Sequence, residues 1–243
     1  MFVKNILVFE EKANPADTVM PFFADGYPGL VYHETEGGMW VQPQNKSMPV
    51  AFLYGQTLHP IELHLSGNYK MIVFQLYPFV LNSFFNVNPK ELNDNCYNLQ
   101  QVQDWKDCET VAQMADEIES KVAHISRFLY QLFLTQQQNL DFLVRKGLAL
   151  ILDQRAQITI KDLCRNLNTT VRTFERRFLK EVGVSPKDFI QITRFQQSLE
   201  QLSDNDFNKL TDVVYANGFA DQSHFIRVFK AFTGITPSKF LKK

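Results

Sequence analysis

The chain is poor in residues that would indicate secretion, a structural metal or a membrane. Its cysteines number only three, so they cannot all pair, and their spacing fits no metal site: Cys96, Cys108 and Cys164. The longest apolar stretch, residues 71–81, is interrupted by a glutamine and a proline and is too short to cross a bilayer. Residues 1–10 lack the long apolar run of a secretion signal. We therefore expect a cytoplasmic protein with reduced thiols and no membrane contact.

Patterns typical of catalysis are also missing. The sequence has no Ser/His/Asp set, nucleophile elbow or phosphate-binding glycine loop, so we predict no enzymatic activity. A four-cysteine zinc site is excluded in the first half, which holds only two cysteines. His59, Glu62 and His64 are close in sequence, but they lack the paired-histidine spacing of cupin metal centres. We therefore expect neither a metal nor another cofactor.

The formal net charge of −1 conceals a division along the chain. From Arg155 onward there are 15 Lys/Arg and 9 Asp/Glu, a balance of 15 − 9 = +6. Residues 1–154 hold the remaining 10 basic and 17 acidic residues, a balance of 10 − 17 = −7. Only the last third of the chain is therefore expected to be attracted to phosphate groups.

The first half has the pattern of short β-strands. Between residues 20 and 85, apolar and polar residues alternate in short segments separated by Pro and Gly, which is typical of a sandwich or a cupin-like barrel. We expect this β-rich domain to span 1–108 and to sense a small-molecule effector or a partner. A pocket needs a few polar groups within apolar walls. The candidates for these groups are Tyr32, His33, Tyr54, Glu62 and His64, although the pattern favours an ordinary strand residue at each position.

A helical period follows the strands. Apolar residues recur three and four positions apart in a seam that predicts one helix face: Val111, Ala115, Ile118, Val122, Ile125, Leu129 and Leu132. This seam could pack on its own domain, or it could pair with a second copy of the chain in a homodimer. We assign 109–138 to this helix and a linker, and 139–243 to a separate all-α domain, so that the overall fold class is α+β.

The end of the chain carries one pattern twice, with a constant offset of 51 positions (227 − 176 = 51, 234 − 183 = 51). Each copy has an arginine, a phenylalanine, a glycine, a Ser/Thr-Pro pair and a final phenylalanine. Cap residues and one-sided apolar faces predict two short helices joined by a tight turn in each copy. Gly183 and Gly234 are expected to end the second helix of each copy, because glycine adopts a left-handed conformation easily. Each copy is therefore predicted to be a helix-turn-helix, and a helix of about 17 residues joins the two.

These residues resemble the DNA-binding domain of the AraC/XylS family of transcription regulators. The most specific match covers residues 218–230 and 234–240, from Gly218-Phe219-Ala220-Asp221 to Ser238-Lys239-Phe240. The resemblance implies that the second helix of each copy reads bases in a major groove. It therefore assigns DNA contacts to residues of these two helices: Arg172, Thr173, Glu175, Arg176, Arg177, Gln222, Ser223, His224, Ile226 and Arg227. Arg177 is expected to meet a phosphate rather than a base.

The sequence thus predicts a DNA-binding transcription regulator whose partners are duplex DNA in two adjacent major grooves and a small effector. RNA polymerase would be a further partner if the regulator is an activator. An alternative hypothesis is a small-molecule or metal-binding β-domain protein with an attached DNA tether. Another is a module that uses both helical units to bind a protein, although the balance of +6 in that segment argues against it.

Overall fold

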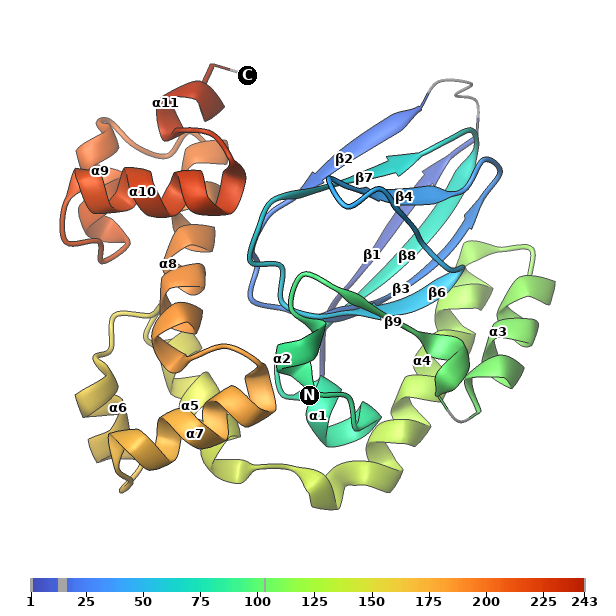
Figure 1. Cartoon of the computed structure of the whole chain (residues 1–243), viewed down its shortest axis with the longest axis horizontal. Helices are drawn as coiled ribbons and strands as arrows, with labels where there is room; N and C mark the ends of the chain where they lie inside the picture. The colour runs from blue at the N-terminus through green and yellow to red at the C-terminus, as the bar shows by residue number, and fades with distance from the viewer. Residues whose placement is uncertain (1, 13–16, 103, 243) are drawn as a thin grey trace.

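The computed structural model describes residues 2–12, 17–102 and 104–242. Figure 1 shows a β sandwich with helices packed beside it, and the carboxyl-terminal helices on the other side of the molecule. The expected α+β class is confirmed. No helix in these described ranges is long and apolar enough to cross a membrane.

Two antiparallel sheets form the sandwich. The first has the order β1-β8-β3-β6-β9, with β1 at Val3–Glu11, β8 at Tyr69–Leu76, β3 at Gly29–Thr35, β6 at Ala51–Tyr54 and β9 at Cys96–Asn98. The second has the order β2-β7-β4-β5, with β2 at Thr18–Phe22, β7 at Ile61–Leu65, β4 at Met39–Gln42 and β5 at Lys46–Ser47. Successive side chains point to opposite faces of a strand. Val31 and Val73 therefore face the second sheet, whereas Tyr32 and Ile72 face the helices.

Four helices cover the outer face and one end of the first sheet: α1 (Val80–Phe85), α2 (Pro89–Leu92), α3 (Trp105–Met114) and α4 (Ile118–Gln136). The expected apolar seam does not lie on one helix, because the chain is extended at Ala115, which ends α3. On α4, Ile125 and Leu129 are buried within their own chain. Of the two interpretations of the seam, the structure thus shows packing on its own domain.

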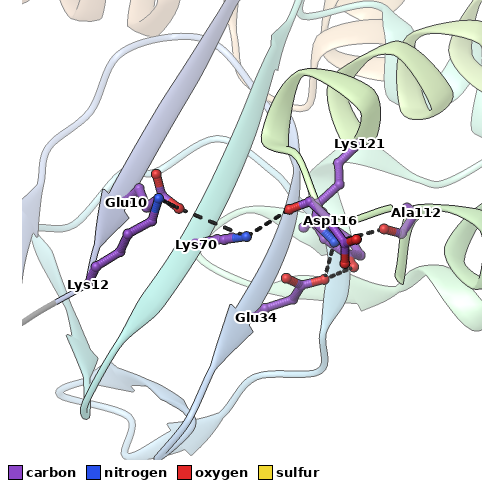
Figure 2. Close-up of polar contacts among 8 residues, drawn as sticks. Glu10, Lys12, Glu34, Lys70, Ala112, Asp116 and Lys121 are labelled. Atoms are coloured by element: carbon purple, nitrogen blue, oxygen red, sulfur yellow. Dashed lines mark hydrogen bonds and ion pairs between the residues drawn. The ribbon is translucent and has the colours of Figure 1, made fainter. Parts of the chain in front are cut away.

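A buried ion pair attaches α4 to the sheet. The Lys121 side chain is only 2% exposed, and its ammonium group donates to Glu34 Oε1 at 2.6 Å and to the Ala112 carbonyl at 2.8 Å. The Tyr32 hydroxyl donates to the same Glu34 oxygen at 2.6 Å. Figure 2 shows this group beside Lys70, whose ammonium donates to the Asp116 carbonyl at 3.0 Å. These contacts hold the α3–α4 hairpin against the first sheet.

Replacing Glu34 with glutamine is expected to destabilise the fold by about 1–2 kcal/mol, because a buried ammonium group would lose its charged acceptor. Urea unfolding followed by circular dichroism measures the change. Glu62→Gln is the matched control, since the Glu62 side chain is 56% exposed and, among the described residues, its one ion pair is with His64 at 3.3 Å. Equal losses in the two variants would contradict a stabilising role for the buried pair.

The remaining helices confirm both predicted helix-turn-helix units. Their bounds are α5 (Phe142–Asp153), α6 (Ile160–Asn166), α7 (Val171–Val182), α8 (Pro186–Ser203), α9 (Leu210–Ala216), α10 (Gln222–Thr233) and α11 (Pro237–Phe240). The 3-10 turns η1 (Leu99–Gln101) and η2 (Gln137–Asn139) precede α3 and α5. The side chains of Thr170 and Asp221 accept backbone N–H bonds at the starts of α7 and α10. Gly183 and Gly234 end these helices with φ of 85° and 76°.

The sandwich side of the molecule shares its hydrophobic core with the first helix-turn-helix unit. Phe174, Phe178 and Val182 of α7 belong to the same buried cluster as Val80 and Phe84 of α1. The second unit has its own cluster, centred on Phe195, Phe225 and Phe229, to which Ala24 of the β domain also contributes. Both units are therefore held against the rest of the chain in this structure.

Candidate nucleic-acid interface and sensor pocket

The first reading helix, α7, presents a charged face to solvent. Arg172, Glu175 and Arg176 are exposed, and the opposite face is buried through Phe174 and Phe178. Thr173 is partly buried, and its hydroxyl accepts a hydrogen bond from Thr170 at 2.9 Å. The two exposed arginines have the donors needed to bridge guanine or to pair with phosphate.

Arg177 differs from the other arginines of α7. Its guanidinium group donates two hydrogen bonds of 2.7 Å to the carboxylate of Asp141, the residue that caps α5. Burial acts to raise the pKa of Asp141, but the hydrogen bonds from Arg177 and from the backbone of α5, together with the positive charge of Arg177, outweigh it, and the pKa is lowered. The expected phosphate contact stays a prediction: in this structure Arg177 joins α5 to α7, and its side chain is still 41% exposed.

The second reading helix, α10, exposes Gln222, Ser223 and Arg227. His224 is partly buried, and its ring packs edge-on against Phe219 at a centroid distance of 5.8 Å. Ile226 is also partly buried and packs against the core of the second unit. The sequence-predicted residues of this helix thus divide into three that face solvent and two that also support the fold.

The connecting helix α8 separates the two units. Its 18 residues span about 27 Å at roughly 1.5 Å per residue. Figure 1 shows α6 and α7 at one end of α8, and α9 and α10 at the other end. Neither reading helix is enclosed by the rest of the chain, because each has exposed residues along one face.

A separate apolar cavity of about 110 Å³ lies between the two sheets. Its walls include Val31, Phe52 and Leu63, and polar groups occur at residues 94–96 and at Lys46. The Lys46 ammonium group donates to Asn95 Oδ1 at 2.9 Å. Mostly apolar walls with a few polar groups are the usual composition of a small-molecule site.

Only one of the five expected pocket residues, Tyr54, lines this cavity. Burial raises its pKa well above the ordinary value, so it is a neutral hydroxyl. Tyr32 belongs to the cluster around Lys121, and the His33 ring is held by Thr35 and the Pro49 carbonyl.

The remaining two, Glu62 and His64, bond to each other at 3.3 Å on β7. These placements correct the expectation of a shared polar pocket. The alternation of apolar and polar residues in the strands could have identified Val31 as a residue of the cavity wall. Nothing local in the sequence identifies residues 94–96 as part of the same wall.

Residues 93–96 connect the cavity to the first reading helix. Asp94, Asn95 and Cys96 line the cavity, and the preceding side chain, Asn93, donates to the Gly183 carbonyl at the end of α7 at 2.8 Å. The Asp94 carboxylate also accepts two backbone bonds from residues 58 and 59, at 2.6 and 3.0 Å. Asp94 in the cavity wall is thus adjacent in sequence to Asn93, which contacts the end of α7.

Comparisons with known proteins agree with this geometry. A family model described as a helix-turn-helix domain matches residues 163–243, and one described as a domain of unknown function (DUF6597) matches residues 1–98. The HTH-type transcriptional activator RhaS of Yersinia pestis is 35% identical over 60 residues, which are 25% of this chain and 22% of that protein. The chain thus spans about a fifth of the length of this curated relative.

Solved structures are similar over longer stretches. The crystal structure of ToxT from Vibrio cholerae O395 covers 98% of this chain and 96% of its own, with a TM-score of 0.50 and 14% identity, and therefore shows a similar fold. A probable AraC family transcriptional regulator from Rhodopseudomonas palustris is 27% identical over 42% of this chain and 96% of its own, with a TM-score of 0.39.

The fold and the exposed helices define a double helix-turn-helix protein with an attached β domain. Residues 163–243 are those of an AraC-type helix-turn-helix domain, which confirms the expected resemblance of this part of the chain to the AraC/XylS regulators.

Proposed function

We propose that this chain is a cytoplasmic, sequence-specific DNA-binding transcription regulator whose β domain senses an effector. The observation that carries the proposal is the pair of exposed reading helices at the two ends of α8. Arg172 and Arg176 on α7, and Gln222 and Arg227 on α10, are exposed side chains that can bond to base edges. As an activator, the protein would also contact RNA polymerase.

The length of α8 supports binding to two adjacent major grooves. Major-groove faces on one side of B-DNA recur about every 34 Å. A rod of about 27 Å with a helix-turn-helix beyond each end can place its two reading helices in successive grooves. One unit alone would contact a single groove, so the duplicated unit lengthens the recognised DNA sequence.

Binding of the full-length chain to DNA selected from a genomic fragment pool tests this function. Fluorescence anisotropy should show an affinity that falls steeply as salt rises, because each neutralised phosphate releases counterions. The full-length chain is the right material, since the first unit shares its core with α1. Absence of salt-dependent binding to every fragment would refute the proposal.

The sensing role rests on the cavity between the sheets. Its mostly apolar lining fits a small apolar effector with one or two polar groups, for which Tyr54 and Lys46 are available. Binding there would act on residues 94–96, and through Asn93 on the end of α7. This path would allow an effector to change the position of the first reading helix.

Filling the cavity provides a test of effector binding. In a thermal-shift screen of small apolar compounds, a true ligand at about 100 times its Kd should stabilise the wild type by about 2.7 kcal/mol. Met48→Trp, which places a larger ring in the cavity wall, is expected to abolish this stabilisation. Met114→Trp is the control, because Met114 is 77% exposed on α3. A ligand that stabilises both variants equally would bind elsewhere.

A further inference from the structure

Strand β1 is an apolar edge of the first sheet that no other described strand covers. It pairs with β8 on one side only, and Figure 1 shows it at the end of the sheet away from β6. Five consecutive residues, 4–8, are exposed, which means that both faces of the strand are open to solvent. Ile6, Leu7 and Val8 are 42%, 36% and 45% exposed.

Such an edge is a template for pairing with another strand, and natural proteins usually block it with charges, prolines or covering segments. The central residues of β1 provide none of these blocks, since the charged residues lie near its ends, at Lys4, Glu10 and Glu11. The only register shift against β8 lies between Val3 and Asn5, so the strand is regular from Asn5 onward.

The sequence of β1 is complementary to itself in one register. In a symmetric antiparallel pair, the two-fold axis passes between one residue and its own copy. With Leu7 on the axis, Ile6 lies opposite the partner's Val8, and Lys4 lies opposite the partner's Glu10. The central apolar residues then face apolar residues, and Lys4 faces an opposite charge at each end, whereas Asn5 lies opposite Phe9 and Val3 opposite Glu11.

The neighbouring registers are worse. With Ile6 on the axis, Lys4 would lie opposite an apolar valine, Val8. With Val8 on the axis, Ile6 would lie opposite Glu10, and Lys4 would lie opposite Lys12.

Both end charges already have contacts within the chain. The Lys4 ammonium group lies 3.7 Å from the centroid of the Tyr27 ring, and Glu10 pairs with Lys12 at 3.1 Å. The charges at the two ends of β1 therefore mainly disfavour the other registers. The apolar residues at the centre of the strand supply most of the contact between the two copies.

We propose that β1 pairs with β1 of a second copy of this chain, so that two five-stranded sheets join across a two-fold axis. The apolar face of α4, which is the other segment considered for dimerisation, is already buried through Ile125 and Leu129. This inference does not depend on DNA binding and can be tested without DNA.

Cysteine cross-linking identifies the register. In a background with the three native cysteines replaced by serine, Leu7→Cys should form an intermolecular disulfide under mild oxidation. Residues directly opposite in an antiparallel pair have Cβ atoms about 4.5–5.5 Å apart. Ile6→Cys and Val8→Cys should each fail to cross-link alone, whereas the double variant should cross-link. Cross-linking of Ile6→Cys alone would overturn the proposed register.

Sedimentation velocity at increasing concentration tests the dimer itself. The wild type should pass from a 28.2 kDa monomer to a species of twice that mass. Val8→Lys should weaken this association about tenfold or more, because it places a lysine opposite Ile6 of the other copy. Val19→Lys is the matched control, since Val19 is 47% exposed on another strand, β2. A monomeric wild type, or a dimer that withstands Val8→Lys, would refute the proposal.

Discussion

Replacing Gly183 with alanine is expected to destabilise the protein by about 2–5 kcal/mol. Gly183 has a φ of 85°, a conformation that costs an L-residue about 1–2 kcal/mol. An added Cβ would also lie 2.7 Å from the Pro89 carbonyl carbon and 2.9 Å from the Lys90 nitrogen. Forcing an atom into a packed site typically costs about 1–3 kcal/mol. Urea unfolding measures the sum of these two effects.

Gly234→Ala is a control supplied by the repeat itself. Gly234 ends α10 as Gly183 ends α7, and its φ is 76°. Its added Cβ would approach only Pro60, at 3.6 Å, which is an ordinary contact. We therefore expect a loss of only about 1–2 kcal/mol from backbone strain. Equal losses of stability in the two variants would show that the contact between α7 and α2 does not stabilise the protein in solution.

Replacing Arg172 with alanine is expected to reduce the preference for selected over random DNA by about 1–3 kcal/mol, or roughly 5- to 150-fold. Arg172 is exposed near the start of α7, and no hydrogen bond or ion pair to its side chain is present among the described residues. It is therefore available to bridge guanine O6 and N7. Anisotropy titrations of both DNAs, at one fixed salt concentration, give the ratio of the two Kd values.

Arg127→Ala serves as the matched control for Arg172→Ala. Arg127 is an exposed arginine on α4, outside the two reading helices, and within the described part of the chain its guanidinium group has one polar contact, with His124 at 3.4 Å. The control removes the same positive charge, so it should change neither the specificity ratio nor, beyond a small electrostatic effect, the affinity. If Arg172→Ala weakened binding to selected and random DNA equally, Arg172 would contact phosphate and not bases.

Much of the carboxyl-terminal half could be predicted because its signals are local. The caps Thr170 and Asp221 bond to backbone groups three residues away, and the glycines that end α7 and α10 act on their own helices. The strands were predicted less completely. Residues 20–85 show the alternation, but β1 is exposed at its centre on both faces and therefore carries no alternation to detect.

The roles of individual residues were less predictable. Arg177 follows Arg176 in a charged stretch, and only the structure brings Asp141, 36 positions away, to its guanidinium group. The cavity-lining residues 94–96 likewise come from a segment with no strong pattern. Because these contacts join residues far apart in sequence, no local propensity indicates them.

The sequence by itself determined the two helix-turn-helix units and the helix between them, since short-range capping, helix periodicity and glycine conformation specify each of them. Only the tertiary structure decided that α7 shares a core with α1 and that Asn93 joins the cavity segment to Gly183. It also decided that β1 is left at an open edge. The physical reason is that packing depends on which distant surfaces are brought together, and burial is a property of the folded chain and not of any one segment.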